Sequence, residues 1–176
     1  PMLLPISNRG SKASNADFIL RGNVPGWERK LRHSLELIKK DFDYIIIDCP
    51  PAIGTLTTMA FVAADHILIP LQPEKASAEG MAELTGFIYS LTLDLNPGLK
   101  IAGAFFSMVN SGWSAHKSKM EEMRDPNLRK SLTRVFGAGA EPFYIFNQEI
   151  RRNSSLLNAS EDGSIMVMQK PRSEYT

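Results

Sequence analysis

The chain has 176 residues, of which 43% are hydrophobic and 22% charged, and its formal net charge is +1. These proportions are typical of one globular domain, and the near-neutral charge gives no reason of its own to expect a nucleic-acid or membrane partner. No apolar run approaches the roughly 20 residues that span a bilayer, and the single cysteine, Cys49, excludes an intrachain disulfide, fits a reducing cytoplasm and makes no metal-ligand pattern with the three histidines.

Short apolar runs alternate with segments of helical period along the chain, which predicts an α/β fold with a mostly parallel sheet. A strand is expected at residues 2–6, an amphipathic helix at 26–40, a strand at 42–47 and a short helix at 56–64. Another strand is expected at 66–71, followed by a second long helix whose apolar face consists of Met81, Leu84, Phe87, Ile88 and Leu91. A strand at 101–109, a helical region at 114–136, a strand at 142–146 and a short helix at 149–159 complete the series. Because Pro126 follows Asp125, the region 114–136 is expected to be kinked or split.

The stretch from Phe42 to Gly54 reads FDYIIIDCPPAIG and carries the most chemical information. Three successive isoleucines suit a strand buried on both faces of a parallel sheet, and such a strand would deliver Asp48 to the carboxyl edge, where open α/β folds bind ligands. A carboxylate there can hold Mg²⁺, directly or through water, beside a nucleotide phosphate. Gly54 would let a backbone amide approach that phosphate. The alternative is a purely structural turn, because Asp favours turns and helix starts.

The segment Asp43–Gly54 resembles the Walker B and switch II segment of the ParA/MinD family of deviant-Walker ATPases. The similarity continues in the same order through residues 63–73, 77–84, 101–109 and 146–159, so it covers most of the chain. This resemblance implies a doubly wound, P-loop NTPase-like sheet with helices on both faces.

The resemblance also implies roles for individual residues. Asp48 corresponds to the aspartate at the magnesium ion, Pro51 and Gly54 to positions that sense the third phosphate, and Met108 and Asn110 to positions near the base. The implied cofactors are ATP and Mg²⁺. In that family ATP closes a homodimer, the dimer binds DNA without sequence preference, and a ParB-like partner stimulates hydrolysis. The implied location is the cytoplasm, on the nucleoid.

The family's phosphate-binding motif, K-G-G-x-G-K-[ST], does not occur in this sequence. We therefore expect residues 1–176 to form one α/β domain that is the second half of a longer ATPase domain. A chain that enters an apolar strand directly after Pro1 favours the same interpretation, and this stretch alone is expected to be inactive. The alternative is a non-catalytic, ParA-like interaction module. Iron–sulfur relatives are disfavoured by the single cysteine, and a membrane-cycling MinD role by the lack of a C-terminal basic amphipathic helix.

Basic residues gather in the region after Ser114, and clustered cations suit contacts to a DNA backbone. A solvated helix face is the alternative, because Glu121, Glu122 and Asp125 lie among them. The candidates are Lys117, Lys119, Arg124, Arg129, Lys130 and Arg134, with Arg151 and Arg152 nearby.

Overall fold

The computed structural model of the protein describes residues 25–50, 52–135 and 143–152. The described residues form two compact units, one made of residues up to Asp65 together with Leu91–Leu99, the other of His66–Ser90 and the residues from Lys100 onward. The predicted strand at residues 2–6 lies outside the described residues.

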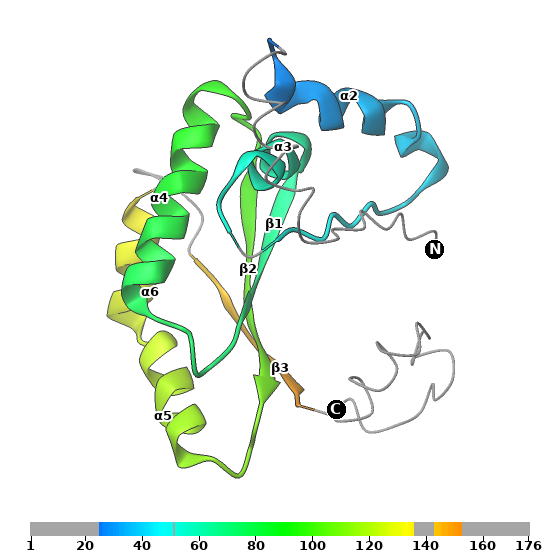
Figure 1. The fold of residues 1–176 in the computed structure, drawn as a ribbon. Helices are drawn as coiled ribbons and strands as arrows, with labels where there is room; N and C mark the ends of the chain where they lie inside the picture. Colours follow the sequence, from blue (N-terminus) through cyan, green and yellow to red (C-terminus); the bar gives the residue numbers. More distant parts are fainter. Residues whose placement is uncertain (1–24, 51, 136–142, 153–176) are drawn as a thin grey trace, which may run out of the picture. The chain divides into compact units, whose positions relative to one another are not determined.

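The second unit is built on a three-stranded parallel sheet. Its strands are β1 (His66–Leu71), β2 (Lys100–Val109) and β3 (Ile145–Arg151), in the order β1-β2-β3. The helices α4 (Ala78–Asp94), α5 (Ser114–Met123) and α6 (Pro126–Arg134) lie along one side of this sheet (Figure 1). The predicted α/β class and parallel sheet are therefore confirmed.

The core of this unit lies between the sheet and these helices. Strand β1 shows the period of two that a half-buried strand requires, because its odd-numbered residues from Ile67 to Leu71 are buried and the even-numbered ones are exposed. Leu68, on the outer face of β1, is 53% exposed. The helices bury apolar side chains against the inner face, including Met81, Ile88, Met120, Met123 and Leu132.

Strand β2 approaches β3 closely at Gly103. This glycine has φ +143°, and a Cβ atom added there would lie 2.8 Å from the Phe146 ring and 2.9 Å from the Tyr144 carbonyl oxygen. Any other residue would meet both steric and backbone strain at this position. Position 103 of β2, which packs against Tyr144 and Phe146, therefore requires glycine.

The predicted break in the region 114–136 is confirmed, since α5 ends at Met123 and α6 begins at Pro126. The Asp125 carboxylate accepts hydrogen bonds from the backbone N–H groups of Asn127 and Leu128, at 2.7 and 3.1 Å. Asp125 is thus the N-cap of α6, and proline suits the first helical position because no N–H is needed there.

The first unit contains the 3-10 turns η1 (Trp27–Arg29) and η2 (Lys39–Asp41), and the helices α2 (Lys30–Glu36) and α3 (Thr55–Ala63). The predicted helix 26–40 is therefore present as three consecutive pieces. Asn96 is 4% exposed, and its side-chain amide donates to the carbonyl oxygens of Phe61 and Ala64, at 3.0 and 2.7 Å. The amide thus supplies donors to two carbonyl groups at the carboxyl end of α3.

The predicted helix at 149–159 is wrong at its start, because residues 149–151 belong to β3. Glu149 pairs with Phe106 and Arg151 with Val109 in the parallel ladder. Pairing with a buried neighbouring strand outweighs the local helical pattern here. The remainder of that predicted helix, from residue 153, lies outside the described residues.

Candidate functional site

Residues 42–50 form neither strand nor helix in the structure, so the predicted buried strand at 42–47 is wrong. Tyr44 and Ile46 are 89% and 86% exposed. A strand needs a neighbour for its backbone hydrogen bonds, and the three described strands pair only with one another. Asp48 therefore lies on an exposed, irregular segment of the first unit and does not follow a buried strand.

The Asp48 carboxylate makes no hydrogen bond or ion pair with any residue that the structure describes. Beside it, the half-buried Cys49 thiol points its sulfur toward the Ile47 carbonyl oxygen, 3.8 Å away. Burial, and secondly the negative charge of Asp48, raise the pKa of the Cys49 thiol. An exposed carboxylate without a partner among the described residues is a ligand that fits Mg²⁺, which completes its shell with water and phosphate oxygens.

Gly54 lies immediately before α3, with the extended backbone angles φ −155° and ψ −169° that any residue adopts. A Cβ atom at Gly54 would meet nothing within 4 Å. The hydroxyl of Thr57 donates to the Ala52 carbonyl oxygen at 2.8 Å, and that of Thr58 donates to the Gly54 carbonyl oxygen at 2.9 Å. These bonds fix the turn, and no described atom fills the space where a Gly54 side chain would lie. Pro51 lies outside the described residues.

Met108 and Asn110, the predicted base-side residues, lie at the carboxyl end of β2 in the second unit. Met108 has φ +58°, and no other described non-glycine residue has a positive φ. This left-handed conformation costs about 1–2 kcal/mol, so the surrounding structure must hold it in place. Asn110 then folds into a turn in which its side-chain oxygen accepts the Gly112 N–H at 3.1 Å.

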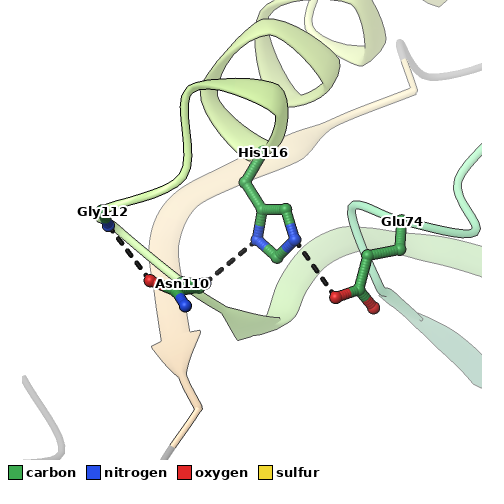
Figure 2. A network of polar contacts seen from close by, with 4 residues as sticks. All are labelled: Glu74, Asn110, Gly112 and His116. Atoms are coloured by element: carbon green, nitrogen blue, oxygen red, sulfur yellow. Dashed lines mark hydrogen bonds and ion pairs between the residues drawn. The ribbon is translucent and has the colours of Figure 1, made fainter.

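A polar network that sequence reasoning missed holds this turn (Figure 2). The Nδ1 atom of His116 accepts the backbone N–H of Asn110 at 3.0 Å, and its Nε2 atom lies 3.2 Å from Oε1 of Glu74. His116 is 3% exposed, and the ring of Trp113 lies edge-on to it with centroids 5.1 Å apart. Glu74 and His116 are 42 residues apart, so no local sequence pattern could have paired them.

Three of the predicted DNA-binding side chains are already engaged. Lys119 donates to both carboxylate oxygens of Glu122, at 2.8 and 2.9 Å. The Nε atom of Arg129 donates to the Phe143 carbonyl oxygen at 3.0 Å. Arg124 lies over the Phe106 ring, 5.2 Å from its centroid, and its Nη2 atom is 3.4 Å from the Phe146 carbonyl oxygen. These contacts occupy donors of Lys119, Arg129 and Arg124, and the assignment of the three side chains to DNA phosphates stays a prediction.

The other basic candidates are exposed, and none of them forms an ion pair within the described part of the chain. Two of them, Lys130 and Arg134, lie one turn apart on α6. Residues at this spacing share a helix face. The exposed set consists of Lys117, Lys130, Arg134, Arg151 and Arg152.

Among the described helices, none combines the length and the apolar character needed to cross a membrane.

The amino-acid sequence of the chain is similar to a protein family and to several known proteins. A family model described as "AAA domain" matches residues 9–101. The chain is 43% identical over 102 residues to the "Chromosome partitioning protein ParA" of Myxococcus xanthus, covering 58% of this chain and 36% of that protein. It is 31% identical over 146 residues to the "Sporulation initiation inhibitor protein Soj" of Bacillus subtilis, covering 83% of this chain and 52% of that protein. It thus spans about a third to a half of these curated relatives.

The fold has a counterpart among solved structures. The chain superposes on cobyrinic acid a,c-diamide synthase from Mycobacterium smegmatis, solved with a bound ATP analog and magnesium, with a TM-score of 0.65. The superposition covers 86% of this chain and 61% of that one at 24% identity, so the likeness supports the fold alone.

Proposed function

This chain belongs to the AAA-domain family of ParA- and Soj-type partition ATPases, and we propose that it supplies the magnesium-side and base-side segments of an ATPase that partitions DNA. Since it spans only 36% and 52% of the two relatives' lengths, we propose that residues 1–176 are the second half of a longer ATPase domain. The phosphate-binding loop would then be encoded before Pro1.

The observation that carries the proposal is the match of the family model to residues 9–101, which include Asp48 and Gly54. The exposed carboxylate of Asp48 has the chemistry to hold Mg²⁺, directly or through water. The open space beside Gly54 would let the backbone at the start of α3 approach the terminal phosphate. Pro51 would sense that phosphate together with Gly54, as the family resemblance implies. Bound Mg²⁺ would neutralise charge on the phosphates. Met108 and Asn110 would lie near the base.

The proposed partners follow from the same family and from the exposed cations. ATP would close a homodimer, and the dimer would bind DNA without sequence preference through its backbone phosphates. A ParB-like protein would stimulate hydrolysis, and the assembly would act on the nucleoid in the cytoplasm. The exposed basic residues, led by Lys130 and Arg134, are the side chains proposed to meet the phosphates.

A non-catalytic, ParA-like interaction module is the second candidate, and it is favoured by the absence of K-G-G-x-G-K-[ST] from these residues. Reading the coding DNA upstream of Pro1 separates the two candidates. An in-frame phosphate-binding motif supports the ATPase, whereas a start codon directly at this point supports the module.

The activity itself is tested on the protein expressed from the complete reading frame. We expect magnesium-dependent ATP hydrolysis that rises with DNA and a ParB-like partner, and that falls at least tenfold in Asp48→Ala. Asp41→Ala is the matched control, since it removes an exposed carboxylate seven residues earlier, before the segment that resembles Walker B, and should leave the rate unchanged. Turnover at the wild-type rate in Asp48→Ala would refute the assignment.

A further inference from the structure

We propose that Glu74 and His116 are positioning residues for the nucleotide base, because together they hold the Asn110 turn at the carboxyl end of β2 in its binding conformation. This inference rests on the proposed function and extends it to two residues that lie outside the motifs of the sequence. Neither residue needs to touch the nucleotide; they act through the backbone of Asn110.

The hydrogen bonds around His116 determine the state of its ring. The backbone N–H of Asn110 can only donate, so the Nδ1 atom that accepts it at 3.0 Å carries no hydrogen. In the neutral ring the hydrogen is then on Nε2, which donates to Oε1 of Glu74 at 3.2 Å. Protonation at Nδ1 would set two N–H groups against each other, so the carboxylate and the amide select one tautomer and one ring orientation.

The pair joins two adjacent strands at the same edge of the sheet. Glu74 lies in the turn that follows β1, where the N–H groups of Lys75 and Ala76 both bond the Gln72 carbonyl oxygen, at 3.0 and 2.8 Å. Asn110 directly follows β2, and β1 and β2 are parallel neighbours. Their carboxyl ends therefore meet at the edge where open α/β folds bind ligands.

The Asn110 side chain has a donor to offer at this edge. Its oxygen accepts the Gly112 N–H at 3.1 Å, and its NH₂ group makes no hydrogen bond to any described residue. An amide NH₂ can donate to an acceptor nitrogen of a purine ring. Two residues earlier, Met108 keeps a strained φ of +58°. A strained, fixed turn with an unused donor matches what a pre-organised base contact requires.

Glu74 is the better residue to change, because its side chain is 43% exposed, whereas His116 is buried. The experiment uses the complete ATPase and compares Glu74→Leu with Glu74→Gln, which keeps an oxygen acceptor. Binding of Mg·ATP is measured by titration calorimetry, and KM and kcat by steady-state hydrolysis. We expect Glu74→Leu to raise the ATP Kd and KM about three- to tenfold, with kcat unchanged, and Glu74→Gln to stay near wild type.

Thr133→Val is the matched control for a merely structural effect. The Thr133 hydroxyl donates to the Arg129 carbonyl oxygen at 2.8 Å and accepts the Phe143 N–H at 2.9 Å, so its loss removes two hydrogen bonds in the same unit. This variant should lower the Tm without changing the ATP Kd. His116→Phe, which keeps an aromatic ring but has no acceptor, should raise Kd at least as much as Glu74→Leu.

The outcomes separate this inference from the function on which it rests. If wild type binds ATP and both Glu74→Leu and His116→Phe bind it equally well, the positioning role is overturned and the ATPase assignment stands. A Glu74→Gln variant as weak as Glu74→Leu would also overturn it, since the acceptor would then not matter. If wild-type protein from the complete reading frame binds no ATP, both proposals fail together.

Discussion

Lys130 and Arg134 offer the sharpest test of DNA binding, because both are exposed, share one face of α6 and form no ion pair within the described residues. We expect the double variant Lys130→Gln/Arg134→Gln to bind DNA more weakly and with a shallower salt dependence. Each phosphate contact contributes a slope of about −0.9 to a plot of log affinity against log salt concentration, so losing two contacts reduces the slope by about 1.8.

That change in slope has a measurable size. Between 50 and 200 mM salt, the ratio of wild-type to variant affinity should fall about twelvefold. Fluorescence anisotropy with labelled duplexes of two unrelated sequences, in the presence of ATP, measures both slopes. The two sequences should give the same loss, since phosphate contacts carry no sequence information.

The control for net charge is Lys30→Gln/Lys40→Gln, which removes the same charge from exposed positions at α2 and η2. This variant should keep the wild-type slope. If the α6 variant also keeps the wild-type slope, or if both variants lose it equally, the exposed face of α6 does not bind DNA and the reasoning is refuted.

Three further predictions concern the fold and the candidate site. Asn96→Ala should lower the free energy of unfolding by about 1–3 kcal/mol in chemical denaturation, because one buried and one partly buried hydrogen bond at the end of α3 are lost; a loss below 0.5 kcal/mol would contradict that contact. Gly103→Ala should cost about 2–3 kcal/mol, because its Cβ would lie 2.9 Å from the Tyr144 carbonyl oxygen at φ +143°, and an unchanged Tm would show that β2 and β3 do not meet this way. Cys49 should react slowly with iodoacetamide at pH 8, because a raised thiol pKa leaves less thiolate, and Asp48→Asn should lower that pKa and speed the reaction; equal rates would place Asp48 too far away to act on the thiol.

The sequence predicted best those features whose cause is local. The strand His66–Leu71 follows from a short apolar run, and its predicted ends are the observed ones. The break between α5 and α6 follows from a capping aspartate and a proline that are adjacent in the chain. Such features need no distant partner, so a single sequence is enough to predict them.

The predictions that were wrong or missing concern features that depend on residues far apart in the sequence. The isoleucine run at 45–47 has the composition of a buried strand, but no described strand pairs with it, and Ile46 remains 86% exposed. Glu149 begins a segment that the sequence predicts to be helical, but its pairing with Phe106 places it in β3. The contact between Glu74 and His116 spans 42 residues and arises only when β1 and β2 bring their ends together.

The magnesium dependence of ATP binding tests the role of Asp48 most directly. Calorimetric titration of the complete ATPase with ATP, once in excess Mg²⁺ and once in EDTA, should give a tighter Kd with the metal. In Asp48→Asn the advantage conferred by Mg²⁺ should shrink about tenfold or more, as for a residue that orients a metal ligand, whereas Asp41→Asn should retain it in full. An Asp48→Asn protein whose ATP affinity responds to Mg²⁺ as strongly as wild type would contradict the assignment of this carboxylate to the metal.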